Sequence, residues 1–371
     1  MTKTAWSEFQ TERARYLSKD FDLEAFDILL AAIVAHHGNG VPVWINVNGP
    51  PSNGKTAMLD TIPCQPLPTP KSAKIKDGII TLDALTPRTL VSGMAEIKRP
   101  GLLERIDNGV LIIKDLAQQM TGEGQREVFA QLRRIYDGEQ ALAFGSGKTF
   151  QWKGRLTLLC ASVRHPWSFD AELGARFLCV SARRAEYSDT VRAGQSKLKK
   201  SVEKLLASTC SPQVTLTESV KTMPLAKALA RCRAAIIRDG YRRDIVEEPI
   251  IESPHRLTHQ LASLLSALQL MRREKIEVSY QSIVRVVTDT IPHLRRGVLA
   301  SLFKYQMRTV DELAEDLALE SQPNETMIRR AVEELTMLQL VAKATVGITD
   351  VYKPGALWNL LENAPGLLPA L

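Results

Sequence analysis

The hydrophobic positions of residues 41–185 fall into five short runs that are rich in β-branched side chains. The runs are 43–47, 78–82, 110–113, 156–161 and 177–180, and helical stretches separate them. Each run is apolar at consecutive positions, which is typical of strands that are buried on both faces. The pattern therefore predicts an α/β fold in which helices cover a parallel five-stranded sheet.

The segments on either side of this core have helical patterns. Residues 1–40 predict a polar helix and then an amphipathic helix over 23–37, which ends at Gly38-Asn39-Gly40. We interpret them as an N-terminal appendage. Residues 186–300 predict an all-helical region, where apolar side chains recur at helical spacing: Leu257, Leu261, Leu264, Leu265, Leu268 and Met271. The predicted segments are thus 1–40, 41–185, 186–300 and 301–371.

Residues 301–371 have a pattern of their own. Thr309 and Glu312 form a capping box that opens a short helix. Asn324 caps a second helix that runs to about Leu338, and its predicted inner face holds Ile328, Ala331, Val332 and Leu335. Two short strands follow, at 341–344 and 351–353, with a turn near Gly347. Two helices followed by a two-stranded wing are the order of a winged helix-turn-helix.

The strongest motif follows the first apolar run and matches G-x-x-x-x-G-K-[ST]. Its residues are Gly49, Pro50, Pro51, Ser52, Asn53, Gly54, Lys55 and Thr56. In such a loop the glycines let backbone N–H groups converge on phosphate oxygens, the lysine reaches the β- and γ-phosphates, and the hydroxyl ligates Mg²⁺. The motif therefore predicts a site for ATP and Mg²⁺, with Lys55 as a catalytic residue and Thr56 as a metal ligand.

A carboxylate at the end of the third run is the second candidate. Asp115 follows 110–113 and Lys114, at the edge of the sheet where a metal-holding acid is expected. An acidic pair is usual here, the first acid for the metal and the second for the attacking water. Either Asp115 is the metal acid and Leu116 occupies the base position, or Asp115 is the base and Lys114 replaces the metal acid. We favour the first alternative.

Residues 138–153 contain GSGKT but lack the first glycine of a second phosphate loop, because Leu142 stands at that position. Strand-like sequence on both sides of Gly-Ser-Gly predicts a β-hairpin instead, with Lys148 near its tip. Lys148 is either a solvated tip charge or a DNA contact.

This order of parts resembles the AAA+ ATPases with a β-hairpin before the sensor 1 strand, the group of the minichromosome-maintenance helicases. With its tail, the chain is also similar to ATP-binding proteins of phages and other bacterial mobile elements. The resemblance implies an AAA+ P-loop NTPase with a helical lid and a C-terminal winged helix-turn-helix. It also implies catalytic roles for Ser162 as sensor 1, Arg176 as an arginine finger for a neighbouring subunit, and Arg256 as sensor 2. Such proteins commonly assemble as rings of six.

The 371 residues carry 48 Lys and Arg against 41 Asp and Glu, a net charge of +7. Residues 301–371 hold six basic and ten acidic residues, a net −4, so residues 1–300 carry +11. Arg329 and Arg330 are candidate DNA contacts on the second tail helix, but Glu333 and Glu334 follow on the same predicted exposed side. The tail therefore predicts either DNA binding or protein–protein contact.

Five cysteines without a C-x-x-C spacing indicate reduced thiols, and no run of about 18 apolar residues occurs. We therefore expect a cytoplasmic protein that does not enter a membrane. The leading hypothesis is an oligomeric ATPase that acts on DNA as a helicase-like motor or loader of a mobile genetic element. The alternative is a slow nucleotide-dependent switch that recruits partner proteins of transposition or phage defence. A monomeric small-molecule kinase fits a lid and a winged tail less well.

Overall fold

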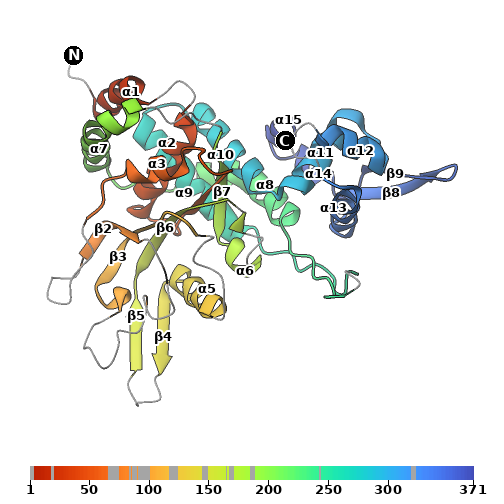
Figure 1. Cartoon of the computed structure of the whole chain (residues 1–371), viewed down its shortest axis with the longest axis horizontal. Coiled ribbons are helices and arrows are strands. Elements are labelled where there is room, and N and C mark those ends of the chain that lie inside the picture. Colours follow the sequence, from red (N-terminus) through yellow and green to blue (C-terminus); the bar gives the residue numbers. More distant parts are fainter. Residues whose placement is uncertain are drawn as a thin grey trace. The chain divides into compact units, whose positions relative to one another are not determined.

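The computed structural model describes most of the chain. Outside the description are residues 1–3, 18–20, 66–74, 83–84, 86–89, 91–100, 117–123, 144–148, 164, 167–170, 184–188, 242–243 and 319–322. The chain forms two compact units (Figure 1). The first unit joins residues 1–214 with 263–279, and the second joins 215–262 with 280–371.

The first unit contains the predicted parallel sheet. Its strands are β1 (Trp44–Asn48), β2 (Ile75–Leu82), β3 (Ile106–Ile113), β6 (Arg155–Ser162) and β7 (Phe177–Ser181). Their order is β2-β3-β6-β1-β7, and every pair is parallel. The five-stranded sheet is thus confirmed, and β1, which leads into the phosphate-loop motif, lies between two neighbours. β2 begins three residues before the predicted run, because Lys76 and Asp77 interrupt its apolar pattern.

Helices cover both faces of this sheet. α5 (Gly124–Tyr136) packs its apolar side chains, among them Phe129 and Leu132, into one core with Trp44 and Cys160. α2 (Leu23–His36) packs on the other face, where His36 Nδ1 lies 3.1 Å from Thr157 Oγ1. The remaining elements near the sheet are α3 (Lys55–Asp60), the 3-10 turn Leu102–Glu104 and α6 (Ala171–Gly174).

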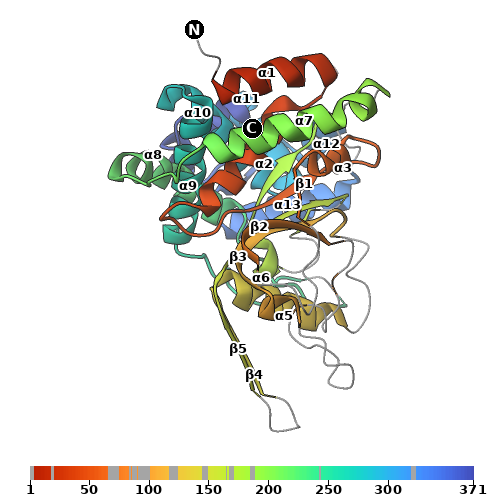
Figure 2. The same cartoon turned by 90° about the vertical axis from the view of Figure 1, so that its left-hand side faces the viewer.

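The amphipathic character predicted for α2 is wrong, because every residue from Ala25 to His36 is buried. α1 (Ala5–Tyr16) supplies part of the cover through Phe9, whose ring centroid lies 5.9 Å from that of Phe26. Figure 2 shows α1, α2 and α7 (Asp189–Ser208) together at the end of this unit opposite the hairpin β4–β5. The N-terminal helices therefore form part of the core and are not an appendage to it.

α2 buries a charged residue, Asp27, between two arginines. Arg13 of α1 lies 2.6 Å from one carboxylate oxygen, and Arg272 of α9 (His255–Arg272) lies 2.9 Å from the other. Burial raises the pKa of Asp27, and the charges of Arg272 and Arg13 oppose that rise. The ion pairs join three helices that lie far apart in the sequence.

The predicted hairpin is confirmed as β4 (Glu139–Ala143) and β5 (Thr149–Lys153), which pair antiparallel between α5 and β6. The Trp152 indole N–H donates to the Ile106 carbonyl over 2.8 Å and ties the base of the hairpin to β3. The hairpin extends away from the sheet in Figures 1 and 2. Lys148 lies outside the described residues.

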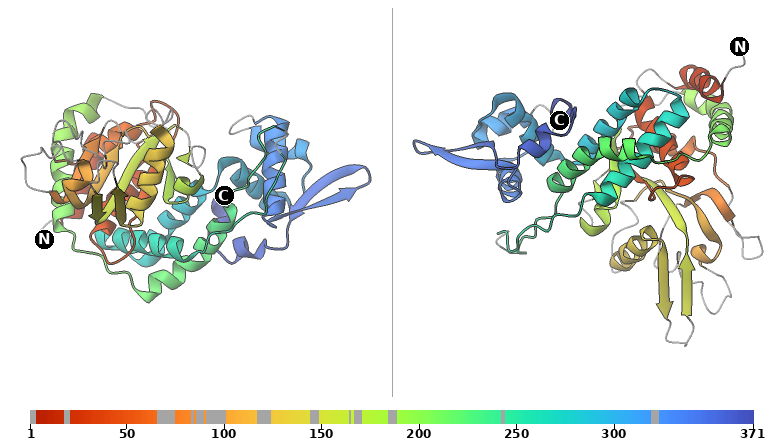
Figure 3. Two further views of the ribbon diagram at one scale, coloured as in Figure 1. Left: turned by 90° about the horizontal axis from the view of Figure 1, so that it is seen from below. Right: turned by 180° about the vertical axis from the view of Figure 1, so that it is seen from behind.

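Helices dominate the rest of the chain: α8 (Leu216–Cys232), α10 (Ile276–Thr290), α11 (His293–Tyr305), α12 (Val310–Ala318), α13 (Glu325–Met337), α14 (Asn359–Glu362) and α15 (Leu367–Ala370). The strands β8 (Val341–Val346) and β9 (Thr349–Pro354) form an antiparallel hairpin that extends beyond α12 and α13 (Figure 3). None of the described helices is long and apolar enough to span a membrane.

The predicted caps in the tail are confirmed. Glu312 N donates to Thr309 Oγ1 over 3.2 Å, and Thr309 N donates to Glu312 Oε2 over 2.8 Å, so the two residues cap α12 reciprocally. Asn324 Oδ1 accepts from Met327 N at the start of α13. The four predicted inner residues of α13 are buried, and Gly347 makes the β8–β9 turn at φ 64°.

Candidate functional site

The phosphate-loop motif connects β1 to α3 as a tight turn. Ser52 has φ 63° and Gly54 has φ 77°, both in the left-handed region, and α3 begins at Lys55 as predicted. Glycine suits this conformation because it has no Cβ, whereas a serine held there stores strain of the kind found at binding sites. A cleft of about 310 Å³ lies over the turn, lined by residues 52–57 and Asp60.

Lys55 lies along the inside of this turn. Its Nζ donates to the carbonyls of Gly49 and Pro50 over 2.7 and 2.6 Å. Burial lowers the pKa of Lys55, while the Asp115 carboxylate raises it. Asp115 follows Lys114 at the carboxyl end of β3, and its charge acts on Lys55.

Lys114 and Asp115 have different neighbours, although they are adjacent in the chain. The Lys114 ammonium lies 2.8 Å from Asp60 Oδ1 at the end of α3, and both side chains are about one-third exposed. Leu116 is buried, and its N–H donates to the Ala161 carbonyl of β6 over 2.8 Å. The polypeptide after β3 is thus held against β6.

These residues fit a nucleoside triphosphate with Mg²⁺. The turn supplies main-chain N–H groups and one ammonium group, which suit phosphate oxygens. Thr56 is exposed in the cleft and has a hydroxyl for a metal, and Asp115 has a carboxylate. No group of three or more His, Cys, Asp or Glu side chains capable of holding a metal occurs in the described part of the chain. Mg²⁺ that is ligated mainly by phosphates and water needs only one or two protein ligands.

Ser162 ends β6 directly beside the last residue of β1, since Asn48 and Ser162 are partners in the β1–β6 ladder. Its hydroxyl is buried and bonded to two asparagines of β1. Asn46 Nδ2 lies 2.8 Å from Ser162 Oγ, and Ser162 Oγ lies 3.4 Å from Asn48 Oδ1. The sequence analysis missed both asparagines, although two polar residues at alternating positions of an apolar strand were a visible signal.

Asn53 of the motif fixes the turn to the strand on the other side of β1. Its Nδ2 donates to the Ala182 carbonyl over 2.6 Å, and Ala182 N donates to the Asn48 carbonyl over 2.8 Å. Ala182 directly follows β7. The turn is therefore anchored to the residue that follows β7.

Arg176 lies at the opposite edge of the sheet. It precedes Phe177, which pairs with Trp44 at the start of β1, whereas the phosphate loop follows the end of β1. Arg176 forms an ion pair with Asp137 over 3.4 Å and lies over the Tyr136 ring, and 16% of its side chain is exposed. This position is remote from the phosphate loop of the same chain, as a residue that serves a neighbouring subunit requires.

Arg256 lies in the first turn of α9, where it forms an ion pair with Glu252. This pair belongs to the second compact unit, whereas the phosphate loop belongs to the first. The sensor 2 role of Arg256 stays a prediction.

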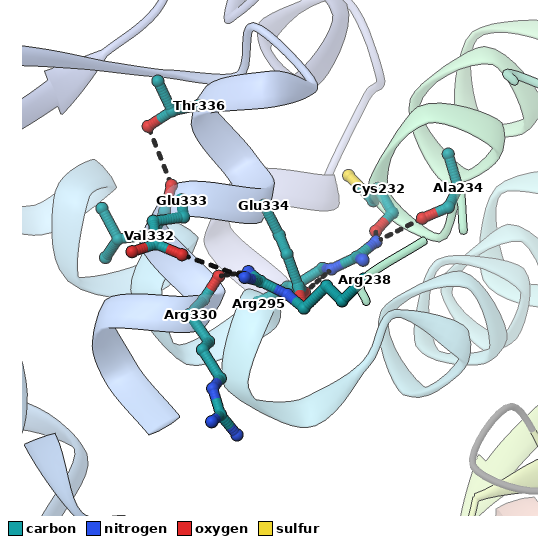
Figure 4. Close-up of polar contacts among 9 residues, drawn as sticks. All are labelled: Cys232, Ala234, Arg238, Arg295, Arg330, Val332, Glu333, Glu334 and Thr336. Carbon is teal, nitrogen blue, oxygen red and sulfur yellow. Dashed lines mark hydrogen bonds and ion pairs between the residues drawn. The ribbon is translucent and has the colours of Figure 1, made fainter. Parts of the chain in front are cut away.

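Arg329 and Arg330 lie on the exposed side of α13. Arg329 is bonded to Glu325 one turn earlier, while the Arg330 side chain points away from the other residues drawn in Figure 4. A cleft of about 640 Å³ lies over this side of the helix and is lined by both arginines, by Lys343 and Tyr352 of the β8–β9 hairpin, and by Arg238.

The expectation that Glu334 shares the exposed side of Arg329 and Arg330 is wrong. Glu334 is held between two arginines, with Arg295 Nε 3.0 Å and Arg238 Nε 3.4 Å from its carboxylate (Figure 4). Arg238 also reaches Glu333 over 3.1 Å. The buried Arg295 in turn donates to the carbonyls of Cys232 and Ala234. Arg238 and Arg295, which both lie outside 301–371, therefore compensate Glu333 and Glu334.

Comparison with known proteins gives little further information. No protein-family model matches the chain, and no curated protein matches it. A similar solved structure is described as "SCCmec type IV Cch - active helicase". It is 11% identical, the match covers 98% of this chain and 72% of that chain, and the TM-score is 0.39. A likeness this low carries no argument about this chain.

Proposed function

We propose that this chain binds and hydrolyses ATP with Mg²⁺. The observation that carries the proposal is the placement of Lys55 inside a strained, glycine-containing turn at the carboxyl end of an internal parallel strand. In open α/β sheets, ligands bind at this edge. Lys55 and the turn would bind the phosphates, and Thr56 and Asp115 would hold the metal. Mg²⁺ would neutralise charge that develops on the phosphate oxygens.

We propose further that the protein is an oligomeric AAA+ ATPase of a mobile element that acts on DNA as a motor or loader. Three features support this. A hairpin precedes the Ser162 strand, Arg176 lies at the edge of the sheet away from its own phosphate loop, and two capped helices with a β-hairpin form the tail. In this proposal the helices between 186 and 300 are the lid and residues 301–371 are the winged helix-turn-helix.

One observation favours the alternative, a slow nucleotide-dependent switch that recruits protein partners. Asp115 is followed by a buried leucine and preceded by a lysine that is bonded to Asp60. Neither neighbour supplies a carboxylate that would activate the attacking water.

Substitution of Lys55 tests the ATP site. Lys55→Ala removes the ammonium that makes charge-assisted bonds to phosphate, each of which contributes about 1.5–3 kcal/mol. We expect calorimetry with ATP and Mg²⁺ to show at least about a tenfold loss of affinity. The exposed Lys153→Ala is the control and should bind as the wild type does. Equal affinity for wild type and Lys55→Ala would exclude the site.

DNA-stimulated hydrolysis separates the motor from the switch. A motor should hydrolyse ATP faster when single-stranded or duplex DNA is added at low salt, where phosphate contacts are strongest. A rate that DNA leaves unchanged at all salt concentrations would favour the switch.

A further inference from the structure

We propose that Asn46 is a positioning residue that acts together with Asn48 to orient the Ser162 hydroxyl for ATP hydrolysis. This inference rests on the proposed function and extends it to two residues of β1 that the phosphate-loop motif does not include.

Both asparagines lie on one face of β1. Trp44, Asn46 and Asn48 alternate along the strand, so their side chains point to the same side of the sheet, where Trp44 packs against α5. Asn46 is 0% exposed and Asn48 is 8% exposed. Asparagine is depleted in strands, and this strand is central and otherwise apolar, so the two residues are a local exception to its pattern.

The neighbouring strands place small polar side chains beside them. In register with Asn48 lie Ser162 of β6 and Ser181 of β7, and in register with Asn46 lie Cys160 and Cys179. The carboxyl ends of three adjacent strands thus form a small polar region directly before Gly49, at the base of the phosphate loop. Asn48 is part of that base, since its carbonyl accepts the N–H of Ala182.

The hydrogen bonds orient the serine. Asn46 Nδ2 donates to Ser162 Oγ over 2.8 Å and also to Asn48 Oδ1. Because the Asn46 amide occupies one lone pair of Ser162 Oγ, the hydroxyl proton must point elsewhere. Asn48 Oδ1 accepts that proton at 3.4 Å, which is long for an O–H···O bond. The two asparagines therefore set the direction of the Ser162 hydroxyl at the base of the phosphate loop.

Stability alone does not explain the three residues. Within the described part of the chain, Asn46 Oδ1 has no hydrogen-bond partner although it is buried. An unpaired buried carbonyl is costly, and apolar β-branched residues would suit this strand better. Residues that break a local rule in this way are expected at functional sites. The structure thus favours a role for Asn46 that goes beyond packing.

A double-mutant cycle tests the inference. Asn46→Val removes the donor and keeps a strand-forming side chain, and Ser162→Ala removes its target. We expect Asn46→Val to lower kcat roughly 10- to 100-fold, as loss of a supporting residue commonly does, while the calorimetric Kd for ATP stays within about twofold. In the Ser162→Ala background, Asn46→Val should lower kcat no further, because its effect passes through the hydroxyl. Hydrolysis is measured by single turnover, which also detects a slow enzyme.

Two variants serve as controls. Cys160 lies in register with Asn46 on the same buried face, but it has no part in the hydrogen bonds that join Asn46, Asn48 and Ser162. Cys160→Ala should therefore leave kcat unchanged. Asn46→Thr restores a hydroxyl donor on a β-branched side chain and should recover part of the lost rate. If Asn46→Val does not fold, as judged by circular dichroism, Asn46→Thr takes its place in the cycle.

The outcomes separate this inference from the proposed function. The positioning role would be overturned, with ATPase activity intact, if the double mutant lost as much kcat as the product of the two single losses. It would also be overturned if Cys160→Ala lowered kcat as much as Asn46→Val does. ATP binding without any hydrolysis would also overturn it. Absence of ATP binding by the wild type would overturn the proposed function itself, and this inference with it.

Discussion

The ammonium of Lys114 lies 2.8 Å from Asp60 Oδ1, an ion pair that joins the end of β3 to the end of α3. The Lys114 side chain is thus bound to α3, whereas the charge of Asp115 acts on Lys55. This arrangement supports the first of the two alternatives for the acid pair, in which Asp115 holds the metal and Leu116 occupies the position of the base.

The first prediction concerns this pair. Asp115→Asn should abolish the increase in ATP affinity that Mg²⁺ causes, because an amide is a much weaker ligand than a carboxylate for a hard cation. Lys114→Met should break an ion pair that is about one-third exposed, worth about 0–1 kcal/mol, and keep the Mg²⁺ dependence. Calorimetry with and without Mg²⁺ checks both. The reverse result would assign the metal to the Lys114 position.

Leu116→Glu is unsuitable as a test of a missing base. Leu116 is 0% exposed and belongs to the core beneath α5, so a carboxylate there would be buried without a partner. Loss of hydrolysis in that variant would report unfolding instead of chemistry.

The second prediction concerns assembly. If Arg176 reaches the ATP of a neighbouring subunit, Arg176→Ala and Lys55→Ala should each be inactive, and a mixture should regain part of the ATPase activity. Some interfaces then pair an intact loop with an intact arginine. Asp137→Asn, which removes the ion-pair partner of Arg176, should stay active. Light scattering with ATP and Mg²⁺ should show a ring, and co-assembly without recovery would contradict the role.

The third prediction concerns DNA. Arg330→Ala should weaken duplex binding equally for all sequences and lower the slope of log K against log salt by about 1, as loss of one phosphate contact does. Arg329→Ala should have less effect, because Arg329 is already bonded to Glu325. Fluorescence anisotropy at several salt concentrations checks this. If wild type and Arg330→Ala have the same slope of log K against log salt, Arg330 does not contact DNA, and binding of a protein partner becomes the proposed role of α13.

The fourth prediction is a pH dependence of stability. Burial lowers the pKa of His36 to about 3, with smaller effects of His37 and Arg155. Between pH 6.5 and 3 the unfolded chain binds a proton at His36 that the native protein does not, so stability falls as pH falls. The slope from this group is about 1.4 kcal/mol per pH unit at most. Urea unfolding of wild type and His36→Gln should show this extra slope in the wild type only.

The fifth prediction concerns the buried acid of α2. Asp27→Asn should lower the free energy of unfolding by about 3–5 kcal/mol, because it removes the carboxylate that Arg13 and Arg272 share and leaves Arg272 with Glu274 as its ion-pair partner. Glu139→Gln removes the exposed ion-pair partner of Lys153, and it should change the free energy of unfolding by less than about 1 kcal/mol. Urea unfolding measures both. Similar losses of unfolding free energy in Asp27→Asn and Glu139→Gln would show that the buried Asp27 ion pairs stabilise the protein no more than an exposed pair does.

The sheet and the phosphate loop were predictable because each rests on local sequence. Continuous apolar runs identify buried strands, and Gly54 and Lys55 stand at fixed positions in a motif. The Asp27 pairs were not predictable, since Arg272 lies 245 residues away in the chain. The sequence likewise predicts an exposed charge at Glu334, because Arg238 and Arg295, which compensate that charge, lie far from it in the chain. The pattern of one segment cannot show which distant side chain covers it.

The first compact unit is discontinuous in the sequence, since it takes in residues 263–279 after leaving out 215–262. Arg272, which binds Asp27, belongs to this late piece. During synthesis on the ribosome, the first unit therefore cannot complete its packing when residue 214 emerges. It must wait for about 65 further residues, which take several seconds at ordinary rates of translation. For that interval the nascent chain carries a formed sheet with an unfinished helical cover.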